Sequence, residues 1–279
     1  MARTLKNLLH KKAANSLVLK NLFIDYHDRL VLNNERRRVS RAYFNSIRNI
    51  HQGRRGFVIG NGPSLKPSDL SKIRNEVSIA SNLIYLIFDQ TDWRPNYVTV
   101  VDRLVWDKLH SIASRHYRSL IIAGGLDPAK TDCLTYTMFS NGHAPSYSYS
   151  ASSNSFDWPF SADLSKGVWG GSTVTYENLQ LAVHLGLNPI YLIGCDHYYQ
   201  GESSAVEGVP VTHSVKNHFS DAYRSVGEKV NPAPIGNMTR AYEIAQSFAL
   251  SRGIEIVNAT RGGYLEVFPR CDFDNIFSR

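Results

Sequence analysis

The sequence predicts an α/β fold, an open, doubly wound and mostly parallel (Rossmann-like) sheet that follows an N-terminal helical extension. From residue 56 to residue 260, short apolar runs alternate with segments of helical character, the order of elements that builds a parallel sheet. Several of these runs end in glycine, asparagine or aspartate, and folds of this class bind ligands at the carboxyl ends of their strands. The 279 residues, 43% of them hydrophobic, suffice for a substantial core.

Each predicted element follows from a local pattern. The strands are short runs rich in β-branched and aromatic residues, expected over residues 57–59, 77–82, 97–102, 119–123, 189–193 and 254–260. The helices show helical spacing of apolar residues or follow a capping residue, and they are expected over residues 68–73, 104–109, 173–186 and 238–252.

The positive charge of the chain is concentrated at its N-terminus. Residues 1–55 hold thirteen Lys or Arg against three acids, a surplus of ten, so with a net charge of +7 the remaining residues 56–279 carry −3. Residues 1–50 lack Gly and Pro and show mixed helical spacing, which predicts one or two amphipathic helices with basic faces. These helices can pack on the body or on a second subunit, or contact an anionic membrane surface. Nucleic acid is not an expected partner, because the basic residues lack an aromatic stacking pattern.

Composition excludes several classes of protein. No apolar run approaches the roughly 18 to 20 residues of a spanning helix, and the N-terminus lacks a signal-peptide core. The three cysteines are far apart and odd in number, which argues against a disulfide framework or a zinc site. We therefore expect a cytoplasmic protein with no metal site.

The first glycine-rich turn is Gly60-Asn61-Gly62-Pro63-Ser64, directly after the first strand. Glycines on both sides of Asn61 allow positive φ and leave N–H groups for a ligand. A helix capped by Ser64 or Ser68 would add partial positive charge and complete an anion site, which suits a nucleotide phosphate. The turn is neither a dinucleotide-binding fingerprint nor a P-loop.

Polar residues also end the later strands. Asn82 follows the second strand and is placed for hydroxyl or amide recognition, while Asp102 ends the third and is suited to a ribose or phosphate site or to capping the next helix. A second glycine turn leads to Ser172 and Thr173, either of which can cap the helix that follows. These features are expected to converge on one edge of the sheet.

Two further regions carry candidate functions. Residues 126–165 are rich in Ser, Asn, Tyr and Pro without a period, for instance over 146–154, and we interpret them as a loop-rich insertion on the acceptor side or a lid. His218 lies in a loop segment, and a histidine over the cleft can take a proton from a sugar hydroxyl.

The motif Gly60-Asn61-Gly62-Pro63-Ser64-Leu65 resembles the opening of the bacterial sialyltransferases that use CMP-sialic acid. It also resembles the wider family of proteins similar to the archaeal hydroxymethylpterin diphosphokinase (domain of unknown function 115), which includes flagellin-modifying glycosyltransferases. Residues 169–199, a glycine turn, a helix and a strand closing on G-x-D, resemble both families. The pattern N-A-T-x-G-G-x-L-E-V-F-P-R at 258–270 resembles the diphosphokinase-like family. The resemblance spans about residues 56–272 and leaves out the basic extension.

The resemblance implies a metal-independent glycosyltransferase that moves a nonulosonic (sialic-type) acid from a CMP donor, with no separate cofactor, to a cell-surface glycan or polysaccharide such as lipopolysaccharide. In this reading Tyr198 stabilises the leaving phosphate, His218 takes the acceptor proton, and Asp102 belongs to the site. The remaining contacts to the nucleotide sugar are expected from Asn61, Gly62, Pro63, Ser64, Asn82, Gly171, Ser172, Thr173 and Asp196. The chain departs from the sialyltransferases in having Ala205 near a second phosphate tyrosine and no histidine near Asn237.

Two alternatives remain open. One is a diphosphokinase that uses ATP and Mg²⁺, with Asp102 and Asp196 holding the metal. The other is a nucleotide-binding protein without turnover. A basic extension would suit an enzyme that works at the inner face of the bacterial membrane, as a monomer or a homo-oligomer.

Overall fold

The computed structural model describes residues 34–144, 159–199, 204–206, 209–211, 216–231 and 233–278. Most of the predicted N-terminal helices, over residues 1–33, and the Ser- and Tyr-rich run at 146–154 lie outside the described residues.

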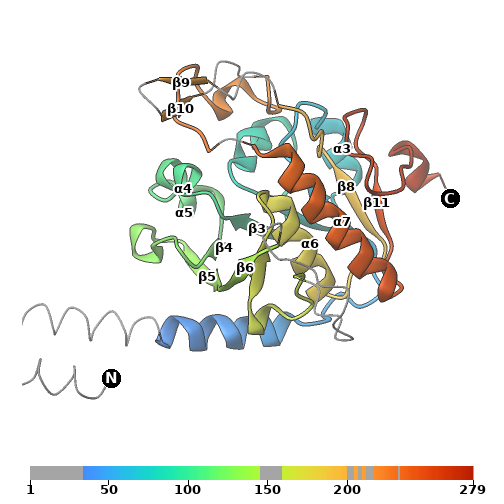
Figure 1. The fold of residues 1–279 in the computed structure, drawn as a ribbon, viewed down its shortest axis with the longest axis horizontal. Helices are drawn as coiled ribbons and strands as arrows, with labels where there is room; N and C mark the ends of the chain where they lie inside the picture. The colour runs from blue at the N-terminus through green and yellow to red at the C-terminus, as the bar shows by residue number, and fades with distance from the viewer. Residues whose placement is uncertain are drawn as a thin grey trace, which may run out of the picture.

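The centre of the molecule is a seven-stranded sheet in which every pair of neighbours is parallel (Figure 1). The prediction of an open, doubly wound α/β fold is confirmed. In the order β11-β8-β1-β2-β3-β4-β5, the strands are Ile256–Asn258, Ile190–Ile193, Gly56–Ile59, Val77–Ser81, Tyr97–Val100, Ser119–Ala123 and Leu134–Met138.

Helices connect and cover these strands. Residues 34–47 form an N-terminal helix, and the other α-helices are α3 (Pro67–Lys72), α4 (Arg103–Leu109), α5 (Ala113–His116), α6 (Val174–His184) and α7 (Ile235–Ser251). The short 3-10 helices are η1 (Ile84–Gln90), η2 (Pro128–Lys130), η4 (Leu164–Lys166), η5 (Asp221–Tyr223) and η6 (Asp274–Phe277). Two small sheets pair β6 (Ser140–His143) with β7 (Val168–Gly170) and β9 (Ser204–Val206) with β10 (Val209–Val211).

The sheet separates two hydrophobic cores, because successive side chains of a strand point to opposite faces. In β1, Val58 belongs to the core beneath the N-terminal helix, α6 and α7, whereas Phe57 and Ile59 belong to the core beneath α3, η1, α4 and α5. Strands buried on both faces are continuously apolar rather than alternating, which is why they were recognisable in the sequence.

The order of the strands places a topological switch point beside β1. From β1 the chain moves outward through β2, β3, β4 and β5, and it later returns to β8 on the other side of β1. The carboxyl ends of β1 and β8 therefore lie where the direction of the chain reverses, the place where sheets of this class bind ligands.

The edge strand β5 lies inside the region that we predicted as a loop-rich insertion at 126–165. Its sequence Leu-Thr-Tyr-Thr-Met alternates β-branched threonines with larger side chains and pairs along its whole length with β4. Part of that insertion is thus a strand of the central sheet. The polar composition around it concealed the pattern.

The N-terminal helix packs against β5 and the first core, along the bottom of the view in Figure 1. The Ser40 hydroxyl accepts a hydrogen bond from the backbone N–H of Thr137 at 2.9 Å, and Tyr43 stacks on Tyr136 with ring centroids 3.4 Å apart. Phe44 is 1% exposed. The packed body therefore begins before our predicted boundary at residue 56, and this helix packs as the first of the predicted roles requires. Its cover also protects an edge strand.

Replacing Phe44 by Ala should lower the free energy of unfolding by about 3 to 5 kcal/mol, because it empties a buried aromatic site. Urea denaturation measures this loss. Val39→Ala on the same helix is the matched control, since Val39 is 44% exposed and its truncation should cost under about 0.5 kcal/mol. Equal stability of the two variants would contradict the docked position of the helix.

Candidate functional site

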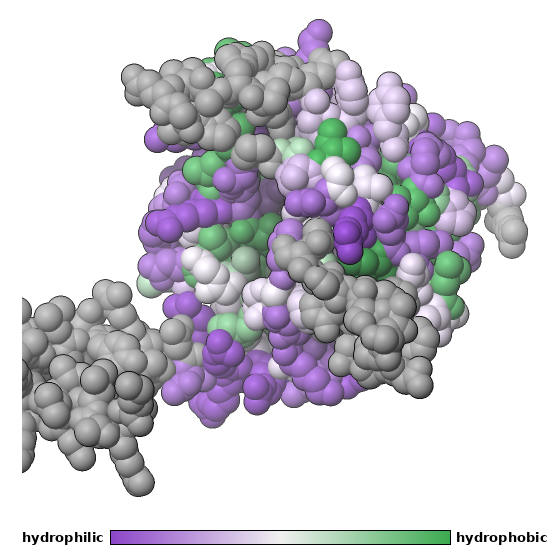
Figure 2. All heavy atoms as spheres, in the orientation of Figure 1, coloured by the Kyte–Doolittle hydropathy of each residue, from purple (hydrophilic) through white to green (hydrophobic). Residues whose placement is uncertain are grey.

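Two adjoining cavities open at the carboxyl ends of the strands. We name the larger, of about 670 Å³, the main cavity, and the smaller, of about 100 Å³, the switch-point pocket. The main cavity lies over the ends of β3, β4, β6 and β7, and the switch-point pocket lies between the loops after β1 and β8. Their linings share Asn82, Thr173, Tyr199, His218 and Tyr223, so the two form one continuous site. Figure 2 shows hydrophobic surface toward the middle of one face, surrounded by hydrophilic surface.

The loops after β1 and β8 touch each other closely. The N–H of Gly60 donates to the carbonyl of Ile193 at 2.8 Å, and the N–H of Gly62 donates to the carbonyl of Gly194 at 2.9 Å. A Cβ on Gly62 would lie 1.8 Å from Oδ2 of Asp196. Our expectation of free N–H groups at these two glycines was therefore wrong. Positive φ, at +65°, occurs at Gly194 in the facing loop.

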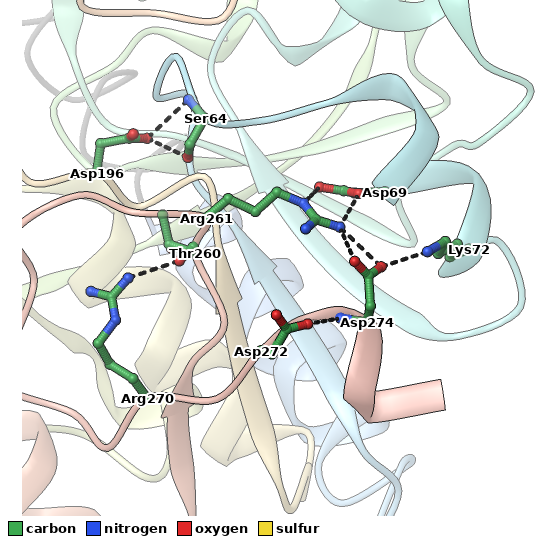
Figure 3. A network of polar contacts seen from close by, with 9 residues as sticks. All are labelled: Ser64, Asp69, Lys72, Asp196, Thr260, Arg261, Arg270, Asp272 and Asp274. Carbon is green, nitrogen blue, oxygen red and sulfur yellow. Dashed lines mark hydrogen bonds and ion pairs between the residues drawn. The ribbon is translucent and has the colours of Figure 1, made fainter. Parts of the chain in front are cut away.

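Ser64 does not cap a helix but holds Asp196. Its hydroxyl donates to Oδ2 of Asp196 at 2.8 Å (Figure 3). The N-cap of α3 is Lys66, which makes no side-chain cap, so the predicted capping by Ser64 or Ser68 was wrong. Burial raises the pKa of Asp196, and the hydrogen bonds from Ser64 oppose that rise.

Residues of the motif at 258–270 form hydrogen bonds with the loop that carries Asp196. The backbone N–H of Cys195 donates to the Thr260 hydroxyl at 3.1 Å, and the N–H of Tyr264 donates to the carbonyl of Asp196 at 2.8 Å. Arg270 donates to the carbonyl of Thr260 at 2.8 Å. The conspicuous pattern at 258–270 therefore positions the Asp196 loop.

A second set of contacts fixes α3 to the C-terminus (Figure 3). Arg261 binds the buried carboxylate of Asp69 through two hydrogen bonds of 2.8 and 3.0 Å. It also reaches Asp274 at 3.0 Å, and Lys72 lies 2.5 Å from the same carboxylate. Such a bidentate pair on a buried carboxylate is worth more than a pair on the open surface. Asp69, in the first turn of α3, thus has a structural role.

Four buried polar atoms of the switch-point pocket have no hydrogen-bond partner within the described part of the chain: Oδ1 of Asn61, Oδ1 of Asn82, Nδ1 of His197 and Nδ1 of His218. The amide of Asn61 donates to the carbonyl and the hydroxyl of Ser81, both at 3.2 Å, and this fixes where its oxygen lies. Buried polar groups are almost always paired in folded proteins, so such a concentration indicates a ligand site.

Asp102 has the capping role that the sequence left open, and its role in a ribose or phosphate site stays a prediction. One of its oxygens caps α4 by accepting from the N–H of Leu104 at 2.7 Å, and it also accepts from the Asn231 amide at 2.9 Å. Asp102 lines the main cavity as well. Its carboxylate is therefore held in place rather than free to swing.

The second glycine turn brings the start of α6 to both cavities. Thr173 caps α6 by accepting from the N–H of Thr175 at 3.4 Å, and it lines both cavities. Ser172 has φ of +61°, and its hydroxyl lies 2.9 Å from Nε2 of His143. Gly171 packs against Tyr176 instead, where a Cβ would lie 2.4 Å from the ring.

His218 and Tyr198 occupy different environments. His218 stacks on Tyr223, with ring centroids 3.8 Å apart, and burial together with the charges of Arg224 and Lys108 lowers its pKa to about 3. Its imidazole is thus neutral at pH 7 and a weak base. Tyr198 is 47% exposed and borders the switch-point pocket. It also borders an outer hollow that includes Pro63. The predicted roles of both residues stay predictions.

Sequence reasoning missed several residues that line the main cavity, His143, Arg37 and Glu177 among them. His143 lies in a polar segment without a period, and Arg37 lies in the N-terminal helix, 4.2 Å from the centre of the Phe139 ring. Glu177, in the first turn of α6, is 8% exposed, and its Oε2 has no partner among the described residues. Burial raises its pKa to about 8. Its place in the first turn of α6, close to the predicted cap Thr173, was the signal that could have found it.

No group of three or more His, Cys, Asp or Glu within the described ranges could hold a metal ion. In the same part of the chain, no helix has the length and apolarity needed to cross a membrane.

Replacing Glu177 by Gln should stabilise the protein increasingly as the pH rises. The folded state keeps a proton that the unfolded state releases, so between about pH 4.5 and pH 8 wild-type stability falls by up to about 1.4 kcal/mol per pH unit. Glutamine does not ionise. Thermal unfolding from pH 5 to pH 8.5 should therefore show a Tm difference that grows with pH. The exposed Glu243→Gln is the matched control, and a constant difference for Glu177→Gln would contradict a buried neutral carboxyl.

Comparison with protein-family models gives a match. A family model described as 6-hydroxymethylpterin diphosphokinase MptE-like matches residues 31–202. The match starts at the N-terminal helix, earlier than residue 56 where we placed the start of the resemblance, and ends after β8. No curated protein and no solved structure matches the chain. The description names a group-transferring enzyme, which points to a transferase. Since the match covers more than half of the sequence, the chain belongs to the 6-hydroxymethylpterin diphosphokinase MptE-like family.

Proposed function

We propose that the protein is a transferase whose nucleotide substrate binds in the switch-point pocket. The observation that carries this proposal is the set of four unpaired polar atoms of Asn61, Asn82, His197 and His218 at the switch point of the sheet. Two amide oxygens accept hydrogen bonds, and a nucleotide offers ribose hydroxyls and an exocyclic amine as donors. Burial lowers the pKa of both histidines, so both rings are neutral at pH 7 and keep a nitrogen free to accept.

The N-terminus of α6 can bind the phosphate group of the nucleotide. Thr173 and Val174 line both cavities, so the N-terminus of this eleven-residue helix borders the passage between them. Helix N-termini favour anions through their unpaired N–H groups and the helix dipole. A nucleotide bound at Asn61 and Asn82 would therefore extend its phosphate toward Thr173 and its activated group into the main cavity.

We propose a CMP-activated sugar, of the nonulosonic (sialic-type) class, as the donor and a glycan as the acceptor. The support is the resemblance of residues 60–65 and 169–199 to the CMP-sialic acid-dependent enzymes. The bond from the sugar to phosphate breaks when developing negative charge on phosphate is stabilised, and hydrogen-bond donors at Thr173 and Tyr198 can do this. The main cavity, at about 670 Å³, is large enough to receive an acceptor sugar.

A second candidate is a diphosphokinase acting on a pterin with ATP and Mg²⁺, and the family description favours it. Asp102 and Asp196 would then be the oxygen ligands of the metal. Asp102 now accepts from Leu104 and Asn231, and Asp196 accepts from Ser64. Both carboxylates would need to exchange or share these partners.

A panel of nucleotides measured by thermal shift separates the candidates, because stabilisation follows affinity. We expect CMP or CDP to raise the Tm of the wild type without metal. Asn61→Ala should weaken that binding about tenfold, since it removes a hydrogen bond of about 1 to 1.5 kcal/mol. The exposed Asn45→Ala is the control and should bind as the wild type does.

Other outcomes have distinct meanings. Selective stabilisation by ATP that requires Mg²⁺ would overturn the CMP-sugar proposal and favour the diphosphokinase. Binding of CMP with no turnover of CMP-sugars would favour a nucleotide-binding protein without catalysis. If Asn61→Ala left nucleotide binding unchanged, the nucleotide would not bind in the switch-point pocket.

A further inference from the structure

The main cavity contains a serine–histidine pair at a strained turn. Strand β6 runs beside β7 with His143 opposite Gly170, so the imidazole stands next to the turn that enters α6. Ser172 in this turn adopts φ of +61°, which is uncommon for a residue other than glycine. That conformation places its hydroxyl 2.9 Å from Nε2 of His143, at the edge of the main cavity.

A buried carboxyl lies close to the same turn and gives an independent sign of a ligand. A Cβ built on Gly170 would be 3.5 Å from the His143 ring and 3.7 Å from Oε1 of Glu177, so both groups lie close to this glycine. Glu177 is 8% exposed, lines the cavity and has an unpaired Oε2 among the described residues. Because burial raises the pKa of Glu177 to about 8, its carboxyl is mostly protonated at pH 7 and can donate to a substrate oxygen.

We propose that Ser172 and His143 form a proton relay that activates the accepting hydroxyl in the main cavity, beside Glu177. This inference rests on the proposed glycosyl transfer. The accepting oxygen forms a bond to the anomeric carbon while the bond between that carbon and the phosphate oxygen breaks. The electron pair of the breaking bond leaves with CMP. The proton of the accepting hydroxyl passes to the Ser172 oxygen as Ser172 gives its own proton to Nε2 of His143.

In this relay the final proton acceptor is His143 and not His218, the residue that the sequence analysis predicted. His218 is buried and stacked on Tyr223 between two cationic side chains, a setting that disfavours its protonated form. His143 is exposed at the cavity, where an imidazolium can be solvated. The other charged groups that line the main cavity are Arg37, Asp102 and Arg224, and each of them influences the pH dependence of the relay.

The test measures CMP release from CMP-sialic acid, with water as the accepting hydroxyl, for Ser172→Ala, His143→Gln and the double variant. Each single change should lower kcat about 100-fold, the usual contribution of a proton-transfer group. The kcat of the double variant should lie within about threefold of the kcat of the slower single variant, because the two groups act in series. The acidic limb of the pH–rate profile, which a histidine base produces, should vanish in His143→Gln.

Two controls separate the relay from folding and nucleotide binding. His110→Gln removes a partly exposed histidine outside both cavities, whose Nδ1 lies 3.0 Å from the carbonyl of Lys130, and it should leave kcat unchanged. Stabilisation by CMP should be the same in all variants. Loss of CMP binding in Ser172→Ala would make Ser172 a nucleotide contact and overturn the relay.

The outcomes also separate this inference from the function on which it rests. Wild-type turnover that survives His143→Gln or Ser172→Ala within about threefold would overturn the relay and leave glycosyl transfer standing. Absence of CMP release by the wild type would overturn both.

Discussion

The close contact between the loops after β1 and β8 is the constraint on which the site depends. Gly60 and Gly62 bring one loop against Gly194 and Asp196 of the other, at distances that no side chain on these glycines would permit. Ser64 then binds Asp196, and the Thr260 hydroxyl holds the backbone at Cys195. With both loops fixed, Asn61 and Asn82 line the small switch-point pocket. The glycines serve this packing first, and ligand binding depends on side chains.

The sequence predicted the fold well, because strands buried on both faces are continuously apolar and because glycine and capping residues mark where they end. It missed β5, and it left open what the N-terminal helix packs against, since the partners of both are distant in the chain. Ser40 and Thr137, for example, are ninety-seven positions apart. The pattern of strand ends also predicted that Asn61, Asn82 and Thr173 would come together, as the structure shows.

What the sequence could not predict was how each polar group is used. The N–H groups of Gly60 and Gly62 are occupied by carbonyls of the neighbouring loop, which only the sheet order reveals. His143 and Glu177 come from separate elements, and both lie close to Gly170 because β6 and β7 are paired and α6 begins shortly after β7. The ionisation of His218 and Glu177 is set by burial, and burial is a property of the folded chain.

A crystal structure of the protein with bound CMP tests the central claim most directly. The account predicts that the nucleotide lies in the switch-point pocket, with donors of its base or ribose within hydrogen-bond distance of Oδ1 of Asn61 and Oδ1 of Asn82, and with phosphate toward Thr173. A nucleotide bound elsewhere, or one that leaves both amide oxygens unpaired, would contradict it.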